Sequence, residues 1–339
     1  MQKTGYIICA IVVIAAVAGF AGWYIIPYAQ PAPVPDNLVI TTGSPEYSAM
    51  TLVAAKKGFF TKYGLNVTIR DYPSGIGAVD ELMAGNADLA YAAEFVGVSL
   101  IGKYPDLRIL GSTANCDVIS IIARTDRGIV SPRDLRGKSI AVPKNTQAEF
   151  FLGRYLTLNG INHTDIIIHY LAPADLVQSV VSGQSDAAII WEPNVYTIEQ
   201  QLGMNSTTFP AQGGQQFYWL IYTRPDVIRT RPDVLIRYFR ALEEAERYLN
   251  LNEYESKAII QNRVNLPTSY VNSLWKKSQY VLSFDQSLII AMEDESRWMI
   301  SNNLTDKKVV PNYLDYISTE SLRTVSPVSV NIISGEKTK

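Results

Sequence analysis

Two glutamates, Glu94 and Glu192, stand at the ends of two apolar segments that share one pattern. The segments "GNADLAYAAEFVG" (85–97) and "GQSDAAIIWEPNV" (183–195) both read Gly-x-x-Asp-x-Ala-x-x-x-Glu. A carboxylate at the tip of a buried strand can accept hydrogen bonds from an amine, amide or hydroxyl group of a ligand. It can also be solvated at an edge or paired with a buried arginine, and these interpretations stay open.

Paired carboxylates are also the machinery of glycoside hydrolases, but the rest of the sequence does not support enzyme chemistry. The two glutamates belong to separate repeated units, which are a poor scaffold for fixed acid and base geometry. The chain has no Gly-x-Ser-x-Gly elbow, no phosphate loop and no His-Glu-x-x-His motif. Its two histidines, His163 and His169, have no evident acid or nucleophile partner. We therefore expect a binding protein and not an enzyme.

Composition argues against several other kinds of site. The only cysteines are Cys9 and Cys116, and Cys9 lies in an N-terminal apolar run, so neither a disulfide framework nor a Cys/His metal cluster is available. The formal net charge of −2 shows no basic excess that would attract a nucleic acid. We expect no cofactor, no metal and no nucleic acid, and a monomer that binds a small molecule.

The residues around each glutamate predict the same structural unit twice. "LNVTIRDYPSGIGAVDELMAG" (65–85) aligns without a gap with "HTDIIIHYLAPADLVQSVVSG" (163–183). Upstream of these, residues 37–60 and 137–160 each read as strand, polar turn and helix. Each unit is therefore β-α-β-α-β, which implies parallel strands with helices on both faces. The predicted fold class is α/β, with two pseudo-symmetric lobes.

Two further strands are expected to join the lobes as a hinge. Residues 114–128 read as a β-rich strand that leaves the first unit, and residues 217–224 read as the strand that returns. A long helix follows, and the pieces 254–262, 268–280 and 285–301 read as helical. The predicted limits are residues 38–123 and 219–325 for lobe one, 124–218 for lobe two, and 326–339 for a polar tail.

The first 26 residues predict a targeting or anchoring segment. An uncharged apolar run from Tyr6 to Ile26 follows the basic start "MQK". A bilayer needs about 20 apolar residues, whereas the core of a signal peptide needs only about 7–15. We favour an uncleaved anchor, with a cleaved signal as the alternative. The positive-inside rule puts Lys3 in the cytoplasm and everything after Ile26 outside. A proline-rich linker (27–37) then leads to the folded part.

The turns that follow the predicted strands are where a ligand would bind. In an open parallel α/β sheet the ligand lies outside the carboxyl ends of the strands, so two facing lobes share one cleft. Ser44, Ser74 and Thr146 stand where helices begin, and free backbone N–H groups there can bind an anion. These residues can equally be plain helix caps. Asp117 begins the first joining strand and could accept hydrogen bonds. Aromatic residues that could wall the cleft are Tyr47, Phe95, Trp191 and Trp219.

Four stretches resemble one known family closely. They are "SPEYSAMTLVAAKKGFFTKYGLNV" (44–67), "GAVDELMAGNADLAYAAE" (77–94), "DLRGKSIAVPKNTQAEFFLGRYL" (134–156) and "SGQSDAAIIWEP" (182–193). In order and spacing they are similar to the nitrate, sulfonate and taurine class of extracytoplasmic solute-binding proteins, which also includes thiamine-pyrimidine binders. Such proteins serve ABC importers.

The resemblance implies a two-lobed fold of the periplasmic-binding-protein type II kind, which closes on a small ligand and is recognised by a membrane permease and its ATPase. It implies ligand contacts from the strand-end turns of both lobes. By position these fall on Ser44, Tyr47, Ser74, Gly75, Glu94, Thr146, Gln147, Trp191, Glu192 and Trp219.

The expected ligand is a small organic solute that carries both an amine and an anion, such as a sulfonate of the taurine type. The acids Glu94, Asp117 and Glu192 favour a ligand with donors, and the helix N-termini favour an anionic or oxygen-rich end. Alternatives are a pyrimidine or thiamine precursor and a nitrate- or bicarbonate-type anion, although Lys144 is the one evident basic residue for a bare anion.

Two readings from other functional classes remain. Thiamine-pyrimidine synthases share the implied fold, but they need a cysteine-rich iron motif that this sequence lacks. The second is a membrane-tethered ligand sensor without an importer.

Overall fold

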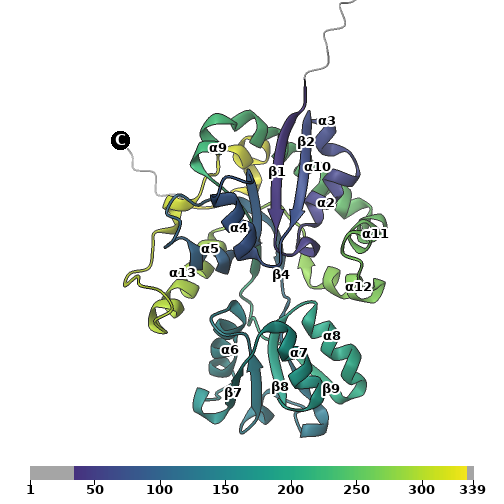
Figure 1. The fold of residues 1–339 in the computed structure, drawn as a ribbon, viewed down its shortest axis with the longest axis vertical. Coiled ribbons are helices and arrows are strands. Elements are labelled where there is room, and N and C mark those ends of the chain that lie inside the picture. The colour runs from purple at the N-terminus through teal and green to yellow at the C-terminus, as the bar shows by residue number, and fades with distance from the viewer. Residues whose placement is uncertain (1–33, 334–339) are drawn as a thin grey trace, which may run out of the picture. The chain divides into compact units, whose positions relative to one another are not determined.

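The computed structural model describes residues 34–333, in which two β-sheets are covered by helices (Figure 1). The predicted membrane segment (1–26), the first part of the linker (27–33) and the end of the tail (334–339) lie outside the described residues. Within residues 34–333, every helix falls short of the length and apolarity that a membrane crossing needs.

The first sheet has six strands in the order β11-β4-β10-β3-β1-β2. Its repeated unit supplies β2, β1 and β3, which run parallel, while β10 runs antiparallel to both β3 and β4. The strands are β1 (Asp36–Thr42), β2 (Leu65–Asp71), β3 (Leu89–Ala93), β4 (Arg108–Cys116), β10 (Phe217–Thr223) and β11 (Ser278–Gln279).

The second sheet repeats this arrangement in the order β7-β6-β8-β5-β9. Strands β7, β6 and β8 are parallel, and β5 runs antiparallel to β8 as β10 does to β3. The prediction of a twice-built parallel unit is therefore confirmed, with an antiparallel strand beside each copy that the sequence reading did not foresee. The strands are β5 (Ile119–Arg124), β6 (Ser139–Val142), β7 (Ile167–Tyr170), β8 (Ala187–Trp191) and β9 (Ser206–Pro210).

The repeated aspartate of the shared motif fixes the register of each unit. Asp88 Oδ2 accepts a hydrogen bond from Val39 N at 2.8 Å, and Asp88 N donates to Val39 O at 2.9 Å. In the second copy Asp186 Oδ2 accepts from Ser139 N at 2.9 Å, and Asp186 N donates to Ser139 O at 3.0 Å. The same side chain thus joins β3 to β1 and β8 to β6 at the same point, which explains why the motif recurs.

Helices cover the first sheet in larger number than the second. The three predicted helical pieces after residue 253 are found at α11, α12 and α13, with ends that differ by a few residues. Gly85 and Gly183 follow α4 and α7 at φ of 85° and 81°, the left-handed conformation that ends a helix without a Cβ clash. The helices around the first sheet are α2 (Ala49–Lys56), α3 (Phe59–Lys62), α4 (Gly75–Met83), α5 (Glu94–Leu100), α9 (Pro225–Thr230), α10 (Pro232–Leu251), α11 (Glu253–Val264), α12 (Thr268–Lys276), α13 (Gln286–Ser301) and α14 (Glu320–Val325); those around the second are α6 (Gln147–Leu158), α7 (Pro173–Ser182) and α8 (Asn194–Leu202).

The chain passes from the first sheet to the second between β4 and β5, and it returns between β9 and β10. The stretch expected as one joining strand is therefore two strands, one in each sheet. β10 lies wholly in the first sheet and is not itself a crossing. We call residues 36–116 and 217–333 the first lobe and residues 119–210 the second lobe; the predicted limits at 123/124 and 218/219 fall inside β5 and β10.

One buried side chain bonds both crossings. Gln212 is 2% exposed, and its Oε1 accepts hydrogen bonds from Val118 N at 2.7 Å and Ile119 N at 2.9 Å. Its Nε2 donates to Cys116 O at 3.0 Å and to Gln215 O at 2.9 Å. Every donor and both acceptor positions of the amide are thereby engaged, so the outgoing and returning segments are held together.

Replacing Gln212 should loosen this junction. In Gln212→Met the buried N–H groups of Val118 and Ile119 lose their acceptor, and we expect a loss of about 3 kcal/mol in the free energy of unfolding, measured by urea denaturation. Gln215→Met is the matched control, because Gln215 Nε2 is buried without a hydrogen-bond partner and its removal should cost nothing. Equal losses in the two variants would contradict the role given to Gln212.

Candidate ligand-binding site

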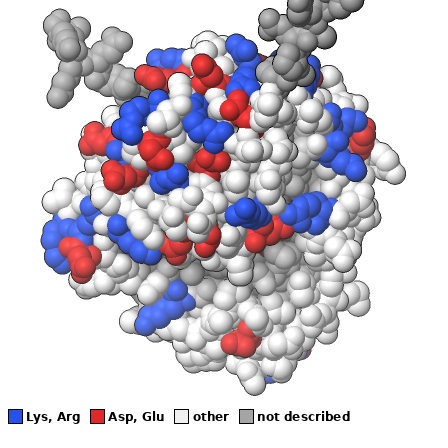
Figure 2. All heavy atoms as spheres, turned by 45° about the horizontal axis from the view of Figure 1, so that its top comes forward, with Lys and Arg blue, Asp and Glu red and all other residues white. Residues whose placement is uncertain are grey.

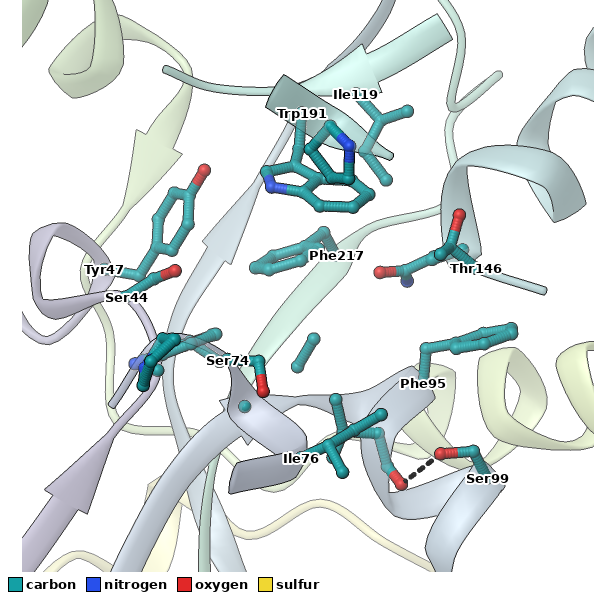
Figure 3. A pocket seen from close by; sticks show the side chains of 18 of the residues that line it. Ser44, Tyr47, Ser74, Ile76, Phe95, Ser99, Ile119, Thr146, Trp191 and Phe217 are labelled. Atoms are coloured by element: carbon teal, nitrogen blue, oxygen red, sulfur yellow. Dashed lines mark hydrogen bonds between the residues drawn. The ribbon is translucent and has the colours of Figure 1, made fainter. Parts of the chain in front are cut away.

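A cavity of about 410 Å³ lies between the two lobes, at the ends of their parallel strands (Figure 3). The first lobe contributes the turn after β1, the start of α4, the start of α5 and β10. The second lobe contributes the start of β5, the turn before α6, the start of α7 and the end of β8. The place that sequence reasoning gave for a ligand therefore holds a cavity.

Eleven residues were predicted to contact a ligand, and the structure separates them into those that line the cavity and those that do not. Glu94, Asp117 and Glu192 do not line the cavity. Those that do are Ser44, Tyr47, Ser74, Gly75, Thr146, Gln147, Trp191 and Trp219.

Aromatic rings form one wall of the cavity. The ring centroid of Tyr47 lies 5.3 Å from that of Phe217 and 5.3 Å from that of Trp219, so the three rings pack as one cluster in the first lobe. Trp191 faces this wall from the second lobe (Figure 3). Sequence reasoning missed Phe217, although it lies two residues before Trp219 in the same strand and thus on the same face. Other lining residues that it did not place at the cleft are Ile76, Val96, Ser99 and Ile119.

Most polar side chains at the cavity already bond the protein. Tyr47 Oη donates to Glu192 O at 3.0 Å across the two lobes. Trp219 Nε1 donates to Ser48 Oγ at 2.9 Å, and Thr146 Oγ1 donates to Pro143 O at 2.7 Å. These groups therefore have no proton left to offer a ligand.

Two hydroxyl donors that stay available lie at the start of α4. Ser74 Oγ accepts from Gly77 N at 3.1 Å and caps the helix, which leaves the Ser74 hydroxyl proton free to donate. The Ser44 hydroxyl forms no hydrogen bond with any described residue, and both side chains border the cavity (Figure 3). Of the three serine and threonine caps predicted, Ser74 alone bonds its helix through the side chain.

No aspartate, glutamate, lysine or arginine is among the residues that line the cavity. Its recognition groups are thus neutral: the hydroxyls of Ser44 and Ser74 at the start of α4, the side-chain amide of Asn145 in the turn before α6, and apolar surface over most of the remainder. Lys144, the basic residue considered for a bare anion, does not line it either. On the face shown in Figure 2 acidic and basic side chains are mixed on the surface, without a large patch of one sign.

Glu192 is a contact between the lobes. It is 1% exposed, and its Oε1 accepts from Lys277 Nζ of the first lobe at 2.6 Å, while Oε2 accepts from Tyr196 N at 3.0 Å. Asp117 lies exposed on the outgoing crossing. The expected pair of glutamates on opposite cavity walls therefore differs from the structure, because each glutamate turns into the protein to satisfy a nearby donor.

Glu94 is fully buried beneath the cavity and also joins the lobes. Its Oε1 accepts from Gln147 Nε2 of the second lobe at 2.6 Å, and its Oε2 accepts from Tyr218 N at 2.9 Å. Gln147 Nε2 donates in addition to Glu295 Oε1 of α13 at 2.9 Å. Burial raises the pKa of Glu94 to about 8 and holds the pKa of Glu295 well above its ordinary value.

Groups for catalysis or metal binding are scarce among the described residues. No group of three His, Cys, Asp or Glu side chains lies close enough together within residues 34–333 to hold a metal ion. Burial raises the pKa of the Cys116 thiol to about 12, so this cysteine is not a ready nucleophile.

Comparisons with known proteins agree with this geometry. A family model described as NMT1/THI5 like matches residues 46–252. A putative binding protein of Brucella abortus (strain 2308) is 28% identical over 258 residues, which cover 70% of this chain and 76% of the relative.

Two solved structures show the same fold. The periplasmic aliphatic sulphonate binding protein SsuA from Escherichia coli has a TM-score of 0.72 at 20% identity, covering 81% of this chain and 95% of that one. A mutant of the desulfurization enzyme DszB, in complex with biphenyl-2-sulfinic acid, has a TM-score of 0.65 at 15% identity, covering 86% and 99%. The predicted resemblance and the two-lobed periplasmic-binding-protein fold are confirmed.

The Glu192–Lys277 contact should contribute to stability through the lobe interface. Removing the charge in Glu192→Gln leaves Lys277 without its carboxylate, and because Lys277 is 27% exposed we expect a loss of only about 1–2 kcal/mol in unfolding free energy. Lys277→Met should cost more, about 3 kcal/mol, because the buried Glu192 carboxylate then loses its cation, and the double variant should cost less than the sum of the two. Additive losses in this urea-denaturation cycle would contradict a direct pairing.

Gly43 should be intolerant of any side chain. A Cβ at this position would lie 2.2 Å from Gly75 N, because the turn after β1 touches the start of α4 at the floor of the cavity. We expect Gly43→Ala to displace α4, lowering the thermal midpoint by several degrees and weakening ligand binding. Gly153→Ala in α6 is the control, since its Cβ would meet no atom within 4 Å and should stabilise the helix by about 0.5–1 kcal/mol.

Proposed function

This chain belongs to the NMT1/THI5-like family, and we propose that it is the substrate-binding subunit of an ABC-type importer. In this role it captures a small organic solute between its two lobes and delivers it to the permease and ATPase. The contacts between the lobes from Tyr47, Gln147 and Lys277 support a closed, ligand-holding arrangement.

The residues that line the cavity support the proposed class of ligand. A neutral wall of aromatic and aliphatic side chains favours an apolar body, and the Ser44 and Ser74 hydroxyls at the start of α4 favour an end rich in acceptor oxygens. We therefore propose an organic sulfonate or a closely related oxyanion. The described lining residues include no carboxylate that would bind the amine expected from the sequence, and the proposed ligand therefore lacks an amine.

The size and chemistry of the cavity also weigh against the alternative ligands. A volume of about 410 Å³ is far more than a nitrate or bicarbonate needs, since one water occupies about 30 Å³ in the liquid. A bare anion would leave the aromatic wall of the cavity in contact with water. An aminopyrimidine offers several N–H donors, and its best partners would be carboxylates, which the lining lacks.

The structural neighbours support an oxyanion with an organic body. One is an aliphatic sulphonate binding protein, and another is in complex with biphenyl-2-sulfinic acid. The second belongs to an enzyme, but the buried thiol of Cys116 and the uncharged cavity lining favour binding without catalysis in this chain.

We place the folded part outside the cytoplasm, as in the periplasmic neighbour, with residues 1–26 as a tether or signal. We propose that it acts as a monomer. Its hinge would lie where the chain crosses between the lobes, at residues 117–118 and 211–216. A tethered sensor remains a second role for the same binding site.

Calorimetric titration of the purified full chain in mild detergent tests the ligand class. We expect octanesulfonate and naphthalenesulfonate to bind at least tenfold more tightly than taurine, because burial of each methylene contributes about 0.8 kcal/mol. Nitrate, bicarbonate and aminopyrimidine should bind weakly or not at all. Binding of a bare anion with no response to organic sulfonates would contradict the proposal.

Two variants locate the bound ligand in the same titration. Ser74→Ala should weaken octanesulfonate binding about fivefold through one lost hydrogen bond, and Trp191→Ala should weaken it at least tenfold through lost apolar contact. The matched control is Ser99→Ala, since the Ser99 hydroxyl already donates to Val96 O at 2.8 Å. A larger effect at Ser99 than at Ser74 would indicate that the oxyanion end of the ligand does not bind at the start of α4.

A further inference from the structure

Two buried acids next to the cavity are joined by one amide from the opposite lobe. Glu94, at the start of α5, and Glu295, in α13, are both 0% exposed. Gln147, the first residue of α6, donates through Nε2 to an oxygen of each, at 2.6 Å and 2.9 Å. The side chain of Gln147 thus holds two carboxyl groups of the first lobe at once.

No cation among residues 34–333 forms an ion pair with either acid. Asp294, which precedes Glu295 in α13, contacts Arg154 of α6 at 3.9 Å. Arg297 is engaged by Glu293 and Asp294 on the exposed side of α13. The other titratable groups that face the pair are neutral phenols and a thiol, namely Tyr218, Tyr222, Tyr313 and Cys116.

The hydrogen bonds show where a proton must sit. Glu94 accepts two hydrogen bonds, whereas Glu295 Oε2 is buried and has no partner. An ionised carboxylate out of water with an unbonded oxygen is strongly unfavourable, and two carboxylates that share one amide disfavour double ionisation further. The pair therefore retains at least one proton while the lobes are together, and Glu295 is the better place for it.

We propose that Gln147, Glu94 and Glu295 form a proton-holding latch, so that closure of the two lobes over a ligand takes up a proton. This inference rests on the proposed function, because it describes how the same site closes. When the lobes part, Gln147 leaves with the second lobe and water reaches both acids. They then ionise as ordinary glutamates.

The sign of the pH dependence follows from this difference. The pKa of Glu94 is raised to about 8 in the joined state, and that of Glu295 is raised as well, mainly because both are buried. The joined state binds more protons than the open one, so its advantage is fully present below the ordinary glutamate range. The advantage declines as pH rises and is lost as pH passes through about 8.

Distance measurements between the lobes test the latch without any ligand. Spin labels at Asp106→Cys and Thr164→Cys, both exposed and on opposite lobes, report separation in the full chain with Cys9→Ala. We expect the shorter distance to dominate at pH 6 and the longer one at pH 9.5. In the double variant Glu94→Gln/Glu295→Gln, which leaves no ionisable group in the latch, the shorter distance should persist throughout. If the distribution of distances between the two labels does not change with pH while Gln147, Glu94 and Glu295 are all present, the proposal is overturned.

Two further variants separate the latch from other buried acids. Gln147→Leu should favour the longer distance even at pH 6, because the bridge is gone. Glu46→Gln is the matched control: burial raises the pKa of Glu46 to about 7, yet this acid makes no hydrogen bond to the second lobe. It should leave the pH response of the distance unchanged. A response abolished equally by Glu46→Gln would overturn the assignment to Glu94 and Glu295.

Titration with octanesulfonate connects the latch to capture. Affinity should fall about tenfold between pH 7 and pH 9 if one proton is taken up, and calorimetry in buffers of different ionisation enthalpy should show that uptake directly. The double variant Glu94→Gln/Glu295→Gln should flatten this dependence. Failure of every sulfonate to bind would reject the proposed ligand class while the distance measurement still decides the latch.

Discussion

Within the described residues the chain passes between its two lobes twice, and the side chain of Gln212 bonds both passages. A buried amide with all its hydrogen bonds satisfied holds the two crossing segments to each other, because a displacement of one against the other leaves a polar group unpaired. Everything at the cavity depends on this junction, since each wall belongs to a different lobe. The aromatic wall and Trp191 keep their relation only while the two connections stay in register.

Much of the fold could be predicted because its determinants are local. The shared motif places a helix-ending glycine, a register-fixing aspartate and an apolar strand within ten residues, and each of these features acts on its immediate neighbours. The antiparallel strands β5 and β10 were not foreseen as sheet members beside each unit. Their apolar sequences fit a joining strand or a sheet strand equally well, and their pairing is decided by distant partners.

The sequence could predict the residues that the sheet topology brings to the cavity. It could not predict the residues whose side-chain positions depend on charge pairing. Ser44, Ser74 and Thr146 stand at strand-end turns, which any parallel α/β lobe directs to the cleft. The glutamates have equivalent places in the two copies, but their partners come from unrelated parts of the chain. Lys277 forms an ion pair with Glu192, whereas Gln147 donates hydrogen bonds to both Glu94 and Glu295. The repeat therefore gives the two glutamates equivalent positions but different charged and hydrogen-bonding partners.

The uncharged cavity lining has a kinetic consequence. Long-range attraction between a charged ligand and fixed opposite charges speeds encounter, and that acceleration is lost at high salt. This cavity offers no such charge from its own walls. Discrimination among solutes must then come from residence time, through apolar contact and a few short hydrogen bonds formed after arrival. Such a receptor would keep its selectivity in surroundings whose salinity fluctuates.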